Sequence, residues 1–177
     1  MGNLTGHSAI SFNLSDSNNK VHRLSDYTGN WLLLVFLRHL GWLPCRAHLS
    51  QLRENEEKLN TYNVKIVVIT FASQDIALEY SKKTGISWPI LIDESRELYQ
   101  GYGMLSASFW DIWGPKTWWA YFKEIVQGHK PKKTTGDIYQ RGGDVLIDPD
   151  GIVRLHYVGD GPVNRPSLDT IFQILES

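Results

Sequence analysis

The chemistry of this sequence is concentrated around Cys45, the only cysteine in a chain of 177 residues. Cys45 follows an apolar run at residues 31–37 and begins a segment with the spacing of an amphipathic helix. A thiol in the first turn of a helix faces free backbone N–H groups and the positive end of the helix dipole, and both favour the thiolate. We therefore predict that Cys45 is a nucleophilic thiol. The alternative interpretation is an inert, buried cysteine that packs like a small apolar residue.

Several charged residues near the thiol are candidates to support it. Arginine stays charged and offers several donors, so Arg38, Arg46 and Arg141 are suited to stabilise a thiolate, and we predict Arg46 and Arg141 as catalytic residues. Each is otherwise a solvated charge at the end of a strand or helix. His39 and His48 are candidates for proton transfer, although such histidines more often satisfy local hydrogen bonds.

Trp42 and Pro44, with Arg38 and His39, are expected to form the substrate side of the thiol. The large ring of Trp42 would make an aromatic wall that either contacts an apolar substrate or closes the site. A second aromatic group lies in residues 104–135. We predict a helical lid there that packs on the sheet edge. The alternatives are an interface with a second copy or an apolar ligand, or docking to a membrane surface.

The hydrophobic pattern predicts the elements that position Cys45. An apolar run without interruption is typical of a central strand covered on both faces, and alternating runs around turn residues are typical of hairpins. The predicted strands cover residues 9–14, 21–23, 31–37, 64–69, 88–92, 144–147 and 152–157. The predicted helices cover about 45–60, 73–83, 94–101 and 166–175. This order predicts one α/β domain over residues 1–177, with a mixed sheet and helices on both faces.

Composition and charge argue against several classes of function. The net charge is −1, so no overall positive field would attract nucleic acid, and we predict no nucleic-acid partner. We find no metal-ligand spacing and no glycine-rich phosphate loop, so no metal or cofactor is predicted. The first residues lack the basic and apolar regions of a secretory signal, and a single cysteine fits a reducing compartment. Together these features predict a cytoplasmic protein.

Separated segments of the chain resemble the thioredoxin-fold peroxiredoxins of the AhpC/TSA superfamily. They are the first hairpin and its turn, one central strand and the last hairpin, at residues 10–14, 24–27, 88–93 and 142–151. Within the superfamily, residues 38–46 and the insert at 103–136 are similar to the branch that includes prostamide/prostaglandin F synthase and selenoprotein L. The resemblance implies a thioredoxin-like fold, and it makes Arg141 the counterpart of a catalytic arginine that precedes the last hairpin.

The resemblance also implies a thiol-dependent peroxidase with Cys45 as its nucleophile. The branch carries Cys-x-x-Cys, or selenocysteine at those positions, whereas here Trp42 occupies the first position. The implied activity is therefore a one-cysteine cycle without a cofactor. An external thiol, such as thioredoxin, glutaredoxin or a small thiol, would reduce the sulfenic acid. The substrate would be a small peroxide or an apolar molecule, the role antioxidant, and a homodimer is a candidate assembly.

Two other hypotheses remain open at this point. One is a thioredoxin-fold protein that has lost redox turnover and binds a ligand or partner through Trp42 and the aromatic insert. The other is a non-peroxidase enzyme that acts on an apolar endoperoxide or another small molecule through Cys45. The reactivity of the Cys45 thiol separates the first hypothesis from both enzymes.

Overall fold

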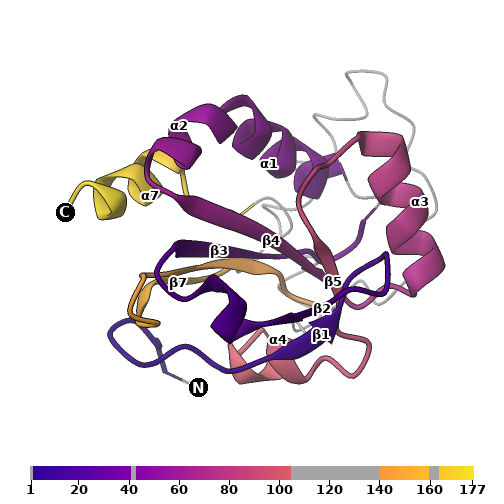
Figure 1. Cartoon of the computed structure of the whole chain (residues 1–177), viewed down its shortest axis with the longest axis horizontal. Helices are drawn as coiled ribbons and strands as arrows, with labels where there is room; N and C mark the ends of the chain where they lie inside the picture. Colours follow the sequence, from indigo (N-terminus) through magenta and orange to yellow (C-terminus); the bar gives the residue numbers. More distant parts are fainter. Residues whose placement is uncertain (1, 41–42, 105–139, 160–163) are drawn as a thin grey trace, which may run out of the picture.

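A mixed five-stranded β-sheet forms the centre of the molecule (Figure 1). The computed structural model describes residues 2–40, 43–104, 140–159 and 164–177. The strand order is β5-β4-β3-β6-β7. Strands β3, β4 and β5 are parallel, and β6 and β7 run antiparallel to their neighbours. The bounds are Trp31–Phe36 (β3), Val64–Thr70 (β4), Ile90–Ile92 (β5), Gly143–Ile147 (β6) and Val153–Val158 (β7). The predicted α/β fold with a mixed sheet is confirmed.

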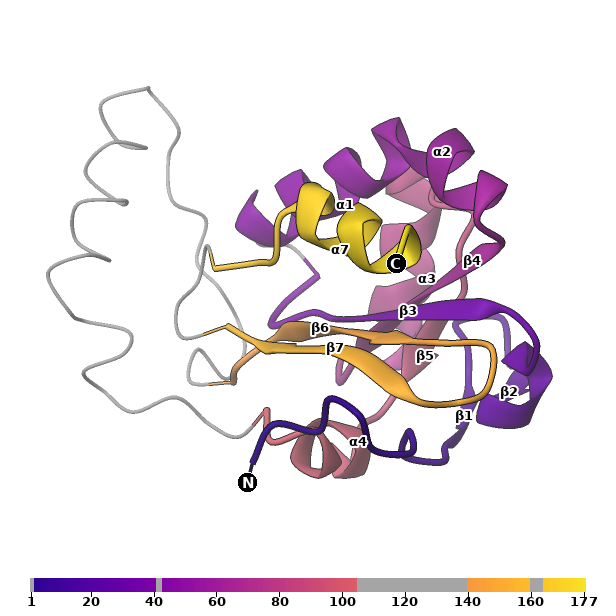
Figure 2. The same ribbon diagram turned by 90° about the vertical axis from the view of Figure 1, so that its left-hand side faces the viewer.

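The alternation along β3 explains why helices cover both faces of the sheet. Leu33 and Val35 belong to the core under α1, α2, α3 and α7, whereas Leu34 and Phe36 belong to the core above α4 (Figure 2). Successive side chains of a strand point to opposite faces, so an unbroken apolar run requires cover on both. The helices are Leu43–Glu54 (α1), Glu56–Thr61 (α2), Gln74–Thr84 (α3), Glu97–Gly101 (α4) and Leu168–Leu175 (α7).

The N-terminal hairpin is shorter than the sequence predicts. Its elements are β1 (Asn13–Ser15), β2 (Val21–Arg23) and the 3-10 helix η1 (Leu24–Tyr27). The prediction of a strand from residue 9 was wrong about its start, because the ladder with β2 begins only at Asn13. Within the hairpin, the buried side chain of His22 hydrogen-bonds to Asp16 at 3.0 Å and to the Tyr27 hydroxyl at 2.9 Å.

Local signals define one end each of α3 and α7. Gly85 ends α3 in the left-handed conformation, with φ of 64°, where glycine has no steric cost. The Ser167 hydroxyl accepts a hydrogen bond from the Thr170 amide and so caps the start of α7. The helix predicted over about 45–60 is divided at Asn55 into α1 and α2.

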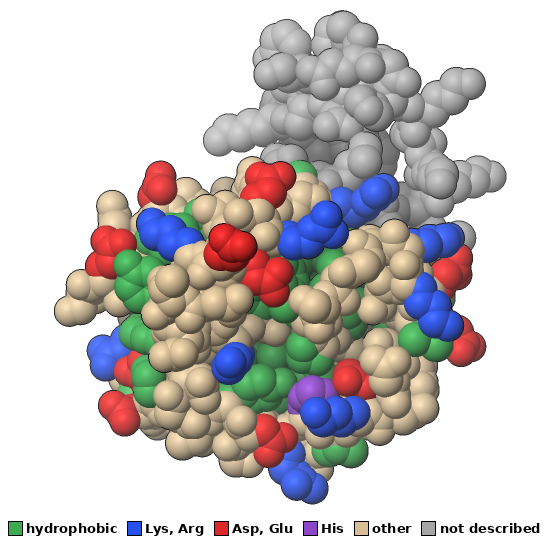
Figure 3. All heavy atoms as spheres, turned by 45° about the horizontal axis from the view of Figure 1, so that its top comes forward, with side chains coloured by type: hydrophobic (Ala, Val, Ile, Leu, Met, Phe, Trp, Pro, Cys, Tyr) green, Lys and Arg blue, Asp and Glu red, His purple; other side chains and the backbone are tan. Residues whose placement is uncertain are grey.

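The surface charges of the described residues are mixed. On the face shown in Figure 3, acidic and basic side chains are interspersed rather than gathered by sign, in keeping with the net charge of −1. In the described parts of the chain, no helix has the length and apolar character needed to cross a membrane. The predicted insert at residues 104–135 lies outside the described residues, apart from Met104.

Candidate active site

Cys45 lies in the first turn of α1, just beyond the carboxyl end of β3. This is the position that the sequence predicts, because the apolar strand ends before the Pro-Cys pair opens the helix. The residue is only 1% exposed and packs in the core cluster that contains Leu40 and Leu49. The free amides and the dipole of α1 favour negative charge at this end of the helix.

An arginine from a distant part of the chain reaches the sulfur. Arg165 precedes α7, and its Nη2 atom lies 4.0 Å from Cys45 Sγ, a long but charge-assisted contact. The same Nη2 donates to the Phe36 carbonyl oxygen at 2.8 Å, and Nη1 donates to the Gly143 carbonyl oxygen at 2.8 Å. These bonds place the guanidinium between the end of β3 and the start of β6.

The guanidinium of Arg165 also meets a buried carboxylate. Asp144 Oδ2 lies 3.3 Å from Arg165 Nη1, and Asp144 Oδ1 accepts a hydrogen bond from His48 Nε2 at 3.0 Å. Burial alone would raise the pKa of Asp144, but the charges of Arg165 and His48 and their hydrogen bonds hold that pKa below its usual value. Burial likewise opposes the charge of Arg165, and Asp144 and Cys45 outweigh it, so its pKa is raised. Cys45, Arg165, Asp144 and His48 thus form one buried polar network.

Two glycines leave room for this network. A Cβ atom on Gly142 would lie 2.6 Å from the Phe36 carbonyl oxygen and 2.9 Å from Arg165 Nη2. A Cβ atom on Gly143 would lie 2.1 Å from the Tyr157 carbonyl oxygen. Real Cβ atoms do not approach backbone oxygens so closely, so glycine is required where β6 begins beside the site.

Two tyrosines flank the network. The Tyr99 hydroxyl is buried and lies 2.6 Å from the Leu37 carbonyl oxygen and 2.9 Å from that of Ile69, so it joins α4 to the ends of β3 and β4. Burial, with a smaller contribution from Cys45, raises the pKa of Tyr80 on α3 to about 12, while Arg46 opposes the shift. The side chains of Cys45 and Arg46 are therefore both within electrostatic range of the Tyr80 hydroxyl.

The predicted catalytic arginines occupy different surroundings. Arg46 is exposed on α1, and Arg141 is half-buried directly before β6. Arg38 is buried after β3, and a Cβ atom on Gly142 would lie 3.1 Å from its Cγ atom, so Arg38 lies close to Arg165. The roles predicted for these three arginines stay predictions.

The predicted substrate residues are only partly described. The His39 ring lies edge-on to Phe71, with 5.5 Å between ring centroids, and the Arg96 guanidinium lies 4.3 Å from the same Phe71 ring. Trp42 lies outside the described residues, as does the side chain of Pro44, whose backbone belongs to α1. Substrate contacts by these residues stay predictions.

Two members of the network, Arg165 and Asp144, are absent from the site predicted by sequence. Arg165 is 120 positions from Cys45, and only the antiparallel return of β7 and the packing of α7 against the same core bring it to the thiol. Its local sequence, directly before the Pro166-Ser167 helix start, carries no chemical signal. The His48 candidate, by contrast, does belong to the network.

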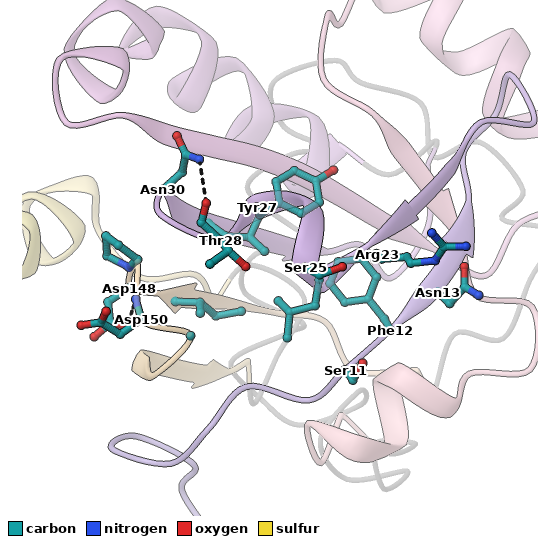
Figure 4. Close-up of a pocket in the computed structure, with 15 residues that line it drawn as sticks. Ser11, Phe12, Asn13, Arg23, Ser25, Tyr27, Thr28, Asn30, Asp148 and Asp150 are labelled. Atoms are coloured by element: carbon teal, nitrogen blue, oxygen red, sulfur yellow. Dashed lines mark hydrogen bonds between the residues drawn. The ribbon is translucent and has the colours of Figure 1, made fainter.

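The structure also has a pocket that lies away from the thiol. A pocket of about 360 Å³ opens at the opposite end of β3, where Figure 4 shows Asp148 and Asp150 on one side and Phe12 and Arg23 on the other. Cys45 does not line this pocket. Among the described residues, no group of three or more His, Cys, Asp or Glu side chains could hold a metal ion.

Relatives of this chain include proteins named as an oxidoreductase, a peroxidase and a synthase. The thiol-disulfide oxidoreductase ResA of Geobacillus thermodenitrificans is 29% identical over 102 residues, and the match covers 56% of this chain and 57% of that protein. The thioredoxin peroxidase of Fasciola hepatica is 23% identical, with 87% of this chain and 68% of the relative covered. The prostamide/prostaglandin F synthase of Salmo salar is 25% identical, with 82% and 74% covered.

Solved structures confirm the thioredoxin-like peroxiredoxin fold. The reduced 2-Cys peroxiredoxin of Plasmodium vivax matches with a TM-score of 0.67 and 18% identity, over 98% of this chain and 94% of that one. A PrxQ mutant of Xylella fastidiosa matches with a TM-score of 0.71 and 14% identity, over 99% and 95%. The model of the AhpC/TSA family matches residues 5–156. This chain therefore belongs to the AhpC/TSA family.

Proposed function

We propose that this protein is a thiol-dependent peroxidase that reduces peroxides with a single cysteine, Cys45. The observation that carries the proposal is the contact of 4.0 Å between Arg165 Nη2 and Cys45 Sγ at the start of α1. A guanidinium held at that distance stabilises the thiolate, which is the form of cysteine that attacks peroxides. The names of the thioredoxin peroxidase relative and of the peroxiredoxin structures support the same chemistry.

The reaction transfers an oxygen atom from the peroxide to sulfur. The Cys45 thiolate attacks the terminal peroxide oxygen, the S–O bond forms and the O–O bond breaks. The other oxygen leaves as an alkoxide, or as hydroxide from hydrogen peroxide, and takes up the proton that the thiol had released. Sulfur loses two electrons and becomes a sulfenic acid, and the peroxide gains the same two electrons.

An external thiol must complete the cycle, because Cys45 is the only cysteine of the chain. The first thiol displaces the sulfenic oxygen as water and forms a mixed disulfide with Cys45. A second thiol releases Cys45 and leaves as a disulfide. Thioredoxin, glutaredoxin or a small thiol would fill this role in the cytoplasm, where a reducing environment maintains them. An antioxidant role and a homodimer accompany this proposal as predictions.

The burial of Cys45 sets a size preference. Because the residue is 1% exposed, a peroxide can reach Sγ only when covering side chains move aside. Small peroxides need the smallest opening, so we expect hydrogen peroxide to react faster than a bulky apolar hydroperoxide. A faster reaction with the bulky apolar hydroperoxide would instead favour a dedicated apolar channel. The similarity to prostamide/prostaglandin F synthase would then point to an apolar substrate.

The decisive experiment combines trapping with turnover. Native protein is treated with hydrogen peroxide or cumene hydroperoxide in the presence of dimedone, which traps sulfenic acids, and the adduct is located by mass spectrometry. We expect one adduct, at Cys45, and catalytic loss of peroxide when dithiothreitol or thioredoxin with its reductase is supplied. The Cys45→Ser variant should show neither. Native protein that forms no adduct and consumes no peroxide would refute the proposal.

A further inference from the structure

We propose that His48 and Asp144 are positioning residues that hold the guanidinium of Arg165 against Cys45. This inference rests on the proposed function, since it concerns how the thiol is activated. Both side chains are buried and polar. Within the network, only Arg165 contacts the Cys45 sulfur. Their effect on Cys45 passes through Arg165.

Asp144 is the centre of the arrangement. Its two carboxylate oxygens have separate partners, with Oδ2 at 3.3 Å from Arg165 Nη1 and Oδ1 at 3.0 Å from His48 Nε2. The side chain of Asp144 is 0% exposed, so water does not compete for either oxygen. A buried carboxylate with two charge-assisted partners has one favoured orientation, and it fixes the direction from which it attracts Arg165.

His48 connects this carboxylate to the helix that carries the thiol. His48 follows Cys45 by three positions on α1, so the two side chains lie on the same face of the helix. Its own side chain is 3% exposed, and the hydrogen bond to Asp144 links α1 to β6. A chain of contacts therefore runs from α1 through His48 and Asp144 to Arg165, in the segment before α7. The distance between Arg165 and Cys45 depends on these contacts.

Loss of His48 would free one end of this path. Asp144 Oδ1 would lose the hydrogen bond from His48, and the carboxylate could rotate or attract a different donor. Arg165 would keep its two bonds to backbone carbonyl oxygens but lose its fixed ionic partner. Because the contact to sulfur is already long, a small rotation of the guanidinium removes it. We expect the thiol to become less reactive although Cys45 and Arg165 are both intact.

The experiment measures the rate at which iodoacetamide alkylates Cys45 in folded protein. Leucine in His48→Leu cannot donate to Asp144, whereas the amide in His48→Gln reaches a similar position and can. We expect His48→Leu to slow alkylation by about tenfold and His48→Gln to restore it to within about threefold of the original protein. Asp144→Asn, which loses the charge that attracts Arg165, should also slow alkylation, although removal of a negative charge beside Arg165 offsets part of the effect.

A double mutant and a matched control separate positioning from a general loss of stability. In an Arg165→Gln background, His48→Leu should slow alkylation by less than about twofold, because its effect passes through Arg165. The control is His22→Leu, which breaks another buried His–Asp pair with the same distance of 3.0 Å in the N-terminal hairpin. His22→Leu should lower the thermal midpoint without slowing alkylation.

The outcomes distinguish this inference from the proposed function. Independent, multiplicative effects of His48→Leu and Arg165→Gln would overturn the inference, as would an unchanged alkylation rate in His48→Leu and Asp144→Asn. If His48→Leu does not fold, a His48→Gln rate more than about threefold below that of the original protein would overturn it. A protein that shows the expected coupling in alkylation but gives no sulfenic acid with peroxide keeps the inference and refutes the peroxidase.

Discussion

Arg165→Gln is the substitution that most directly tests how the thiol is activated. At 4.0 Å and an effective dielectric constant of about 20, a positive charge stabilises a thiolate by about 4 kcal/mol. The opposite charge of Asp144 beside Arg165 removes part of this field at the sulfur. A net loss of about 1.4–2.7 kcal/mol in this stabilisation corresponds to a factor of about 10 to 100. Alkylation of Cys45 by iodoacetamide should slow by the same factor.

Arg165→Lys is the matched control for this test. Lysine keeps the charge, but a single ammonium group cannot reproduce the two-nitrogen contacts to Phe36, Gly143 and Asp144. Its rate should lie between those of the original protein and Arg165→Gln. The glutamine variant should also be less stable by about 3–5 kcal/mol, because it leaves a buried carboxylate without its ionic partner. Rates are therefore compared well below the thermal midpoint. A folded Arg165→Gln that reacts within about twofold of the original protein would refute the reasoning.

Three further outcomes follow from the same contacts. Gly142→Ala should slow alkylation of Cys45 and lower the free energy of urea unfolding by about 1–3 kcal/mol, because the added methyl group would meet Arg165 and a backbone oxygen. An unchanged alkylation rate would contradict this close packing. The lowered pKa of Asp144 implies that its contribution to stability is complete above pH values near 3.8 and is lost as the pH falls through the lowered pKa. Asp144→Asn should therefore flatten the dependence of the unfolding free energy on pH in that acidic range, and an identical slope would be inconsistent with the shift. Tyr99→Phe should cost about 1–3 kcal/mol, measured by thermal unfolding, because the Leu37 carbonyl oxygen loses this buried donor and the Ile69 carbonyl oxygen keeps only the Leu37 amide. A neutral effect would show that the hydroxyl contributes nothing to joining α4 to the sheet.

The sequence predicts the sheet and the position of the thiol because both depend on local pattern. The apolar run at residues 31–37 becomes β3, and Cys45 lies in the first turn of the following helix. The last hairpin forms β6 and β7 as its turn residues indicate. Each of these features is encoded within about ten residues, the scale on which periodicity and turn chemistry act.

The electrostatic partner of the thiol is not encoded locally. Arg46 is adjacent to Cys45 in sequence, yet its side chain is exposed on α1, because neighbouring residues of a helix point in different directions. Arg165 reaches the sulfur from a connection that follows the last strand, and that contact depends on how α7 packs on the sheet. The position of Arg165 follows from strand order and helix packing, and a sequence pattern is compatible with several arrangements of these.

The first twenty residues of the chain protect both outer strands of the sheet. On one side, Gly6 and His7 form backbone hydrogen bonds with Val153, the first residue of β7, and Ala9 with Gly151 in the turn before it. On the other side, Asp16 and Ser17 pair with β5. An unpaired edge strand is a template for association with other chains. The N-terminal segment is synthesised first, but its partners near residues 90 and 152 leave the ribosome much later. The covering segment is consequently already available when each edge strand forms, so neither edge has to wait unpaired for a partner made later.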